Sequence, residues 1–166
     1  HAMPASDQEL WFKMLRQNNL LIEREYPAGV HLKKDLSNYG VLADAVPHYY
    51  GDNFPTGEIS DFAYNKKIFA MGGQVIFEFW GLPEWMQGAT KNTVNVGEYV
   101  RAIVGYCRQS VAKAGKPPNI FGIQNELLQD KDTWKDMVLE LRKGLDAAGF
   151  NEVKIHMPDA STLHTG

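Results

Sequence analysis

The chain has 166 residues and a formal net charge of -3, and 44% of its residues are hydrophobic and 22% charged. This is the composition of one ordinary globular domain, and an acidic chain without Lys/Arg-rich runs is not expected to bind nucleic acid. It has no apolar run long enough to span a membrane, and a lone Cys107 excludes an internal disulfide. Cys107 lies among apolar residues at helical spacing, so a buried, inert thiol is expected.

The first predicted element is a helix over residues 6–18. Ser6 or Asp7 can cap its start. Four apolar residues recur at helical spacing and share a face: Leu10, Trp11, Met14 and Leu15. Residues 20–26 follow as a strand that starts apolar, ends charged and closes at a Pro-Ala-Gly turn.

No clear periodicity runs through residues 30–55, where glycine, proline, asparagine and tyrosine are scattered. This segment is predicted to be a long connection with at most a short helix at 36–45, and long connections within compact domains are usually functional. A helix over 59–71 follows and stops at a Gly-Gly pair, and residues 74–80 form the second predicted strand.

The second half of the chain repeats the alternation. A turn or short helix at 84–87 leads to an amphipathic helix at 94–114, which ends before a Gly-Lys-Pro-Pro breaker. A strand then starts at Asn119, runs apolar, and ends in the triplet Gln124-Asn125-Glu126. Such an apolar run indicates a strand buried on both faces, as in parallel sheets.

The last two predicted elements are a helix at 133–148 and a strand at 152–157. Helices and strands that alternate in this way predict the α/β class, with a parallel sheet and helical crossovers. In such folds ligands bind at the carboxyl ends of the strands. All four predicted strands end in polar or aromatic residues: Arg24, Trp80, Glu126 and Asp159. We therefore predict one site at this rim of the sheet.

Two motifs resemble the retaining (β/α)8-barrel glycoside hydrolases of clan A, and glycoside hydrolase family thirty in particular. They are the segment Phe79-Trp80-Gly81-Leu82-Pro83-Glu84-Trp85-Met86 and the triplet Gln124-Asn125-Glu126. The resemblance covers residues 20–160 and implies barrel strands two to five, that is, a partial TIM barrel. The chain departs from the family pattern at Gly81, Glu84 and Leu127, so the resemblance leaves the sugar and linkage open.

The resemblance implies that Glu126 is the acid/base catalyst of a retaining β-glycosidase, which hydrolyses a β-linked oligo- or polysaccharide. Such an acid needs a raised pKa, which partial burial among aromatic neighbours provides. Asn125 is implied to hydrogen-bond the 2-hydroxyl of the sugar, and Trp80 is expected to stack on the sugar ring. Helix capping is the competing role for Glu126 and Asn125, and core packing is that for Trp80.

Three further residues are predicted to contact substrate. Arg24 is implied to orient the nucleophilic carboxylate, although an ion pair with a nearby carboxylate is an equally open role. If Glu78 faces the barrel interior, it is a buried charge and Arg24 is its expected partner. Trp85 is expected either to contact the sugar or to pack in the core, and Asp159 either to bind a hydroxyl or to cap a turn.

A complete (β/α)8 barrel needs roughly 250 residues, so the chain is expected to form about half a barrel. We treat residues 1–166 as a single segment of a catalytic domain, with residues 1–5 expected to be vector-derived or disordered. The resemblance implies a nucleophile on the seventh strand, which is missing, so the chain alone is expected to be inactive. Its open sheet edges are expected to pair with another copy or with the rest of a barrel. Only the resemblance favours a secreted or periplasmic location.

Two other classes stay open at this point. One is a non-catalytic carbohydrate-binding or structural half-barrel, and the other is an unrelated α/β enzyme in which the Gln-Asn-Glu triplet is a coincidence. No cofactor is expected, because no phosphate-binding glycine-rich loop occurs. No metal site is expected either, because these histidines lack metal-ligand spacing: His31, His48, His156 and His164.

Overall fold

The computed structural model describes residues 4–25, 32–37, 39, 61–79, 81–90, 92–124 and 129–157. In chain order the elements are α1 (Ala5–Gln17), β1 (Ile22–Glu25), α3 (Asp61–Ala70), β2 (Gln74–Phe77), the 3-10 turn η3 (Glu84–Met86), α4 (Val96–Ala114), β3 (Ile120–Gly122), α5 (Lys131–Ala147) and β4 (Lys154–His156). The predicted alternation is confirmed, although the strands are shorter than predicted. Among the described residues, no helix is long and apolar enough to cross a membrane.

The four strands form one parallel sheet in the order β1-β2-β3-β4. The register places Arg24 beside Ile76, Ile76 beside Ile120, and Gly122 beside His156. Because all the strands are parallel, their carboxyl ends lie along the same edge. This is the arrangement of a partial (β/α)8 barrel, which confirms the predicted fold class.

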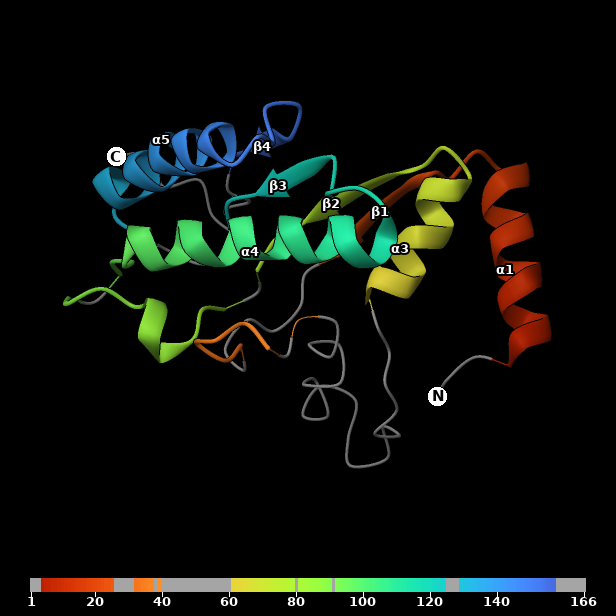
Figure 1. Cartoon of the computed structure of the whole chain (residues 1–166), viewed down its shortest axis with the longest axis horizontal. Coiled ribbons are helices and arrows are strands. Elements are labelled where there is room, and N and C mark those ends of the chain that lie inside the picture. Colours follow the sequence, from red (N-terminus) through yellow and green to blue (C-terminus); the bar gives the residue numbers. More distant parts are fainter. Residues whose placement is uncertain are drawn as a thin grey trace.

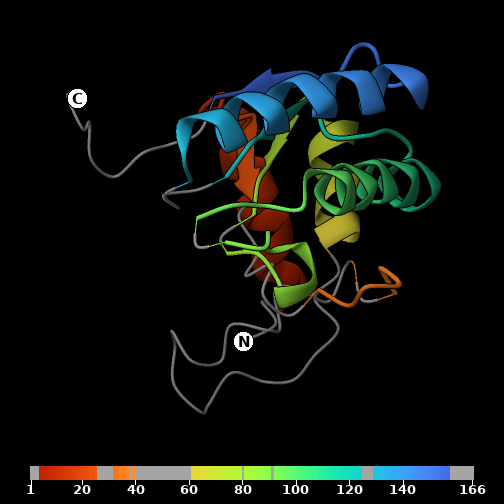
Figure 2. The same ribbon diagram turned by 90° about the vertical axis from the view of Figure 1, so that its left-hand side faces the viewer.

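Helices α3, α4 and α5 cover one face of the sheet, with α4 between the other two, and α1 lies at the β1 end (Figure 1, Figure 2). Successive side chains of a strand point to opposite faces. The side chains that point toward the helices are fully buried: Val75, Phe77, Phe79, Phe121 and Ile123. The opposite face, called the inner face below, carries Arg24, Ile76, Glu78, Ile120, Gly122, Lys154 and His156.

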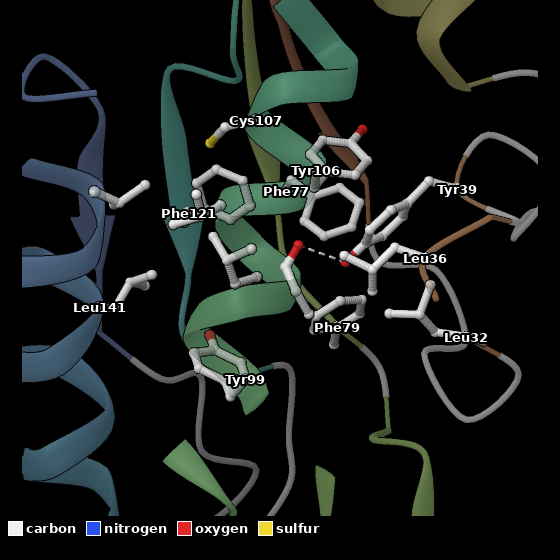
Figure 3. Close-up of a cluster of buried hydrophobic side chains, with 14 of the residues drawn as sticks. Leu32, Leu36, Tyr39, Phe77, Phe79, Tyr99, Tyr106, Cys107, Phe121 and Leu141 are labelled. Atoms are coloured by element: carbon white, nitrogen blue, oxygen red, sulfur yellow. Dashed lines mark hydrogen bonds between the residues drawn. The ribbon is translucent and has the colours of Figure 1, made fainter. Parts of the chain in front are cut away.

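An aromatic cluster joins the sheet to α4. The Phe77 ring lies 3.9 Å from the Tyr106 ring and 5.5 Å from the Phe121 ring, measured between centroids. Figure 3 shows the three rings side by side, with Tyr39 next to Tyr106. The Tyr39 hydroxyl donates to the Ala102 carbonyl at 2.9 Å. Rings of this size bury much of the apolar area that fixes a helix on a sheet.

Cys107 lies within this core, as predicted. Burial raises the pKa of its thiol to about 12. The thiol therefore stays protonated at neutral pH, where it acts as a small apolar side chain.

A polar side chain caps the start of each of the two long helices, which begin at Val96 and Lys131 where residues 94 and 133 were predicted. The Asn95 side chain accepts from Glu98 N at 3.3 Å at the start of α4, and Asp130 Oδ1 accepts from Thr133 N at 3.0 Å at the start of α5. Gly115 ends α4 with a φ of 94°, in the left-handed region that glycine adopts without strain.

Helix α1 differs from its prediction at its start, and most of its apolar face is exposed. Its N-cap residue is Pro4, whose carbonyl accepts from Asp7 N and Gln8 N at 2.9 Å, so the predicted side-chain cap is wrong. Of its apolar face, Leu15 is buried against Ile68 and Val75. The other three side chains stay exposed, at 56% for Leu10, 41% for Trp11 and 47% for Met14. The physical reason is position, because α1 flanks β1, which is an edge strand of the described sheet.

Leu141 and Leu139 lie on the same helix and differ only in burial, at 0% and 48% exposed. Truncating a fully buried leucine removes its transfer free energy and leaves a cavity, at a cost of about 2–5 kcal/mol. We therefore expect Leu141→Ala to lower the free energy of unfolding by that amount in urea titrations. Leu139→Ala is the matched control and should change it by about 0.5 kcal/mol or less. If both variants lowered the free energy of unfolding equally, α5 would have to pack on the sheet through a face other than the one that carries Leu141.

Candidate functional site

The inner face carries a buried ion pair at the carboxyl ends of β1 and β2. The Arg24 Nε–H donates to Glu78 Oε1. The Glu78 side chain is 1% exposed, whereas that of Arg24 is 40% exposed. This confirms that Glu78 faces inward as a buried charge with Arg24 as its partner. The pair puts one guanidinium at the boundary between the protein interior and the open side of the sheet.

Gly122 gives the Glu78 carboxylate its space. The register places the two residues next to each other across β2 and β3. A Cβ atom on residue 122 would lie 2.8 Å from Cβ and 2.9 Å from Cδ of Glu78, closer than real Cβ atoms approach their neighbours. The Glu78 side chain therefore leans over β3, and residue 122 must be glycine for this conformation to persist.

The carboxyl end of β3 is fixed on two sides. The Tyr99 hydroxyl of α4 donates to the Ile123 carbonyl at 2.6 Å, and Ile123 N donates to the His156 carbonyl at 3.2 Å. Burial raises the pKa of Tyr99, and the nearby Glu78 carboxylate raises it further. Tyr99 therefore remains a neutral donor, and it holds the backbone directly before the Gln-Asn-Glu triplet.

Gln124, the first residue of that triplet, is fully buried. Its Oε1 accepts from Gln129 Nε2 at 3.1 Å. Gln124 Nε2 and Gln129 Oε1 have no hydrogen-bond partner among the described residues. Each amide thus places one further polar atom in a buried position, which is uncommon in folded proteins.

The carboxylate of Glu25, at the end of β1, is held on the helix-covered face. Glu25 Oε2 accepts from Asn65 Nδ2 and from the Tyr106 hydroxyl, both at 3.1 Å. Asn65 comes from α3 and Tyr106 from α4, so both helices anchor the end of β1. Since Arg24 precedes Glu25 on the same strand, this anchor also fixes the backbone from which Arg24 projects.

Trp85, in η3, is half-buried beside the core. Its indole N–H donates to the Leu32 carbonyl at 2.7 Å, and the Arg101 guanidinium carbon lies 5.2 Å from the ring centroid. These contacts belong to the packing role considered for this residue. A contact between Trp85 and sugar stays a prediction.

Four of the predicted site residues lie outside the described residues: Trp80, Asn125, Glu126 and Asp159. Their roles therefore stay predictions. The described residues just before them are Phe79, Gln124 and Met157, which follow the last residues of β2, β3 and β4. All three strand ends belong to the edge of the sheet that carries Arg24 and Glu78.

Sequence reasoning missed Gly122, Tyr99 and Gln129. Gly122 gives no signal, because its importance depends on a side chain 44 residues earlier in the chain (Glu78) that only the strand register brings next to it. The amphipathic pattern of residues 94–114 gives no sign of the contact that the Tyr99 hydroxyl makes with the Ile123 carbonyl. Among the described residues, no group of three or more His, Cys, Asp or Glu could hold a metal ion.

Comparison with known proteins bears on the fold. No family model matches the chain, and no curated protein matches it. Among solved structures, a xylanase of glycoside hydrolase family 30, subfamily 8, from Clostridium acetobutylicum is similar, with a TM-score of 0.58 and 19% identity over 90% of this chain and 38% of that one. A GH53 catalytic domain from Ignisphaera aggregans has a TM-score of 0.46 and 16% identity, over 88% of this chain and 42% of its own.

The chain has a glycosidase-like fold. This confirms the resemblance to glycoside hydrolases at the level of architecture. The chain spans 38% of the length of the xylanase, so it corresponds to part of that enzyme's structure. At 19% identity the match does not transfer an activity, a substrate or a catalytic residue.

The Arg24–Glu78 pair makes a clear prediction about stability. Removing one partner of a buried pair typically costs about 3–5 kcal/mol, because the other charge is left unpaired. Arg24 is 40% exposed, so water can partly solvate the site, and we expect Arg24→Met to lower the free energy of unfolding by about 2–3 kcal/mol. Lys143→Met is the control, because Lys143 pairs with Glu140 on the surface of α5. It should cost about 1 kcal/mol or less in the same urea titrations.

Proposed function

We propose that this chain forms barrel strands two to five of a retaining β-glycosidase, with Glu126 as the acid/base catalyst. The observation that carries the proposal is the parallel sheet in sequence order, whose carboxyl edge holds Arg24, Glu78 and the strand that leads into Gln124-Asn125-Glu126. The similarity to a family 30 xylanase over 90% of the chain supports it. The substrate class is a β-linked polysaccharide, and the name of the matched enzyme points to a xylan.

In this proposal Glu126 donates a proton to the glycosidic oxygen while the bond between that oxygen and the anomeric carbon breaks. A second carboxylate attacks the anomeric carbon and forms the glycosyl-enzyme. Water then attacks the anomeric carbon, Glu126 takes up the proton from that water, and the carboxylate leaves. Asn125 would bind the 2-hydroxyl, and Asp159 another hydroxyl of the saccharide.

Trp80 and Trp85 would have different roles, one in contact with the sugar and the other in support of the site. Trp85 already donates its N–H to the Leu32 carbonyl and lies beside the Arg101 guanidinium, so we assign it to the wall that supports the site. Trp80 would provide the flat face for the sugar ring, because it comes three residues after the last residue of β2 in the sequence.

In this proposal the second carboxylate comes from another part of the barrel. Among the described inner-face residues, Glu78 is the carboxylate, and its 1% exposure and its bond to Arg24 keep it from an anomeric carbon. This observation also favours the second candidate for the chain in isolation, which is a non-catalytic carbohydrate-binding half-barrel. We therefore expect the 166-residue chain to hydrolyse aryl β-glycosides no faster than background.

The acid role of Glu126 is tested in a full-length protein that contains this chain. General acid catalysis contributes about 10²–10⁴-fold, so Glu126→Gln should lower kcat for a natural β-linked polysaccharide by that factor. The loss should be smaller for an aryl β-glycoside with a good leaving group, because such a group departs without a proton.

Steady-state kinetics on both substrates measure this difference. The matched control is Glu152→Gln, because Glu152 is an exposed residue that precedes β4. This variant should leave both rates unchanged. Equal losses of Glu126→Gln on the two substrates would remove Glu126 from the acid role.

A further inference from the structure

Arg24 projects from a strand that gives it little support. β1 has four residues and lies at the edge of the described sheet, where it pairs with β2. An arginine side chain has many rotamers, and fixing it costs conformational entropy. A guanidinium that must meet a ligand in one orientation therefore needs a partner that selects that orientation.

Glu78 is such a partner, because it is itself held in place. Its backbone N donates to the Glu25 carbonyl at 2.9 Å, so it continues the pairing of β2 with β1 beyond the last residue of β2. Its side chain is 1% exposed and lies against the backbone of Gly122 on the other side. The carboxylate is thus confined between two neighbouring strands, and its Oε1 accepts from Arg24 Nε.

The energetics of the pair do not suit a purely stabilising role. Burying a carboxylate costs desolvation free energy, and Glu78 Oε2 has no hydrogen-bond partner among the described residues. Buried ion pairs are often no more stabilising than apolar residues of the same volume. What the pair does provide is geometry, since a contact to Nε fixes the plane of the guanidinium and the directions in which its other N–H groups donate.

We propose that Glu78 is the positioning residue of Arg24 and that Gly122 provides the space in which it does so. Oε1 of Glu78 holds the guanidinium at the carboxyl edge of the sheet, in the orientation in which it meets the saccharide. The inference rests on the proposed function for the role of Arg24 toward a sugar. The contact itself does not depend on that function.

The contact is tested in the 166-residue chain by NMR of the Arg24 Nε–H. In the wild type this resonance should be shifted downfield and exchange slowly with water. Glu78→Leu should abolish both properties, and Glu78→Gln, which keeps an acceptor oxygen, should restore slow exchange in part. Slow exchange that persists in Glu78→Leu overturns the proposal.

Gly122→Ala moves the carboxylate without removing a charge, so it is the sharper variant. The added methyl group displaces the Glu78 side chain, and the Arg24 Nε–H should lose its protection from exchange. Gly97→Ala is the matched control, because a Cβ there meets just the Asn95 side chain at 3.7 Å, an ordinary contact. An Arg24 resonance that is unchanged in Gly122→Ala overturns the role of the glycine.

A double variant separates positioning from stability. Arg24→Met with Glu78→Leu replaces the pair by apolar side chains, and its melting temperature should equal or exceed that of the wild type. A clear drop in melting temperature for this double variant would make the pair a structural element and overturn the proposal. The melting temperature of the double variant still tests the proposal if one of the single variants fails to fold.

The kinetic arm uses a full-length protein that contains this chain. Losing a charged hydrogen-bond contact should raise KM by about 10- to 100-fold in Arg24→Met, with a smaller effect on kcat. Glu78→Leu should raise KM similarly, and the double variant should be no worse than either single one. Additive losses would mean that Glu78 acts apart from Arg24, which overturns the proposal. If Glu126→Gln retains full activity, the proposed function fails, while the NMR result still decides the contact.

Discussion

The contact between Phe77 and Tyr106 is the interaction on which the arrangement of the inner face depends. Its ring centroids lie 3.9 Å apart, which fixes the direction of the Phe77 side chain toward α4. Side chains alternate along a strand, so Ile76 and Glu78 must then point to the other face. A shift of one residue would exchange the two sets and bury Glu78 among aromatic rings without a partner. Aromatic packing under α4 thus decides which carboxylate faces the inner side.

Tyr106 extends the same constraint to β1. Its ring packs on Phe77 of β2, and its hydroxyl donates to Glu25 at 3.1 Å. Since Glu25 is thereby held on the helix-covered face, Arg24 must project from the inner face, where Glu78 lies. Tyr106 therefore sets the orientation of both Arg24 and Glu78, although it lies on the helix-covered face and they lie on the inner face. The position of Tyr106 thus determines both the packing of the core and the geometry of the ion pair at the carboxyl edge.

Much of this was predictable because its signals are local. Helical periodicity and stop signals such as Gly115 located the helices. The sequence also indicated Arg24 as the partner of Glu78 for the case in which Glu78 faces inward, and this is the case in the structure. The exposed face of α1 was not predictable, because periodicity indicates that Leu10 and its neighbours share a face but not whether another element covers it. Gly122 escaped for a related reason, since its contact exists only through the register of two strands.

The burial of Glu78 also limits what four strands can do alone. A nucleophilic carboxylate must present an oxygen to the anomeric carbon. Glu78 has one oxygen bonded to Arg24 and its side chain pressed on Gly122, so neither its position nor its exposure allows that attack. Positioning and nucleophilic attack therefore require two different carboxylates. The contacts that hold the guanidinium come from β1, β2 and β3 of this chain. In the proposed function, the covalent step would need a carboxylate other than Glu78.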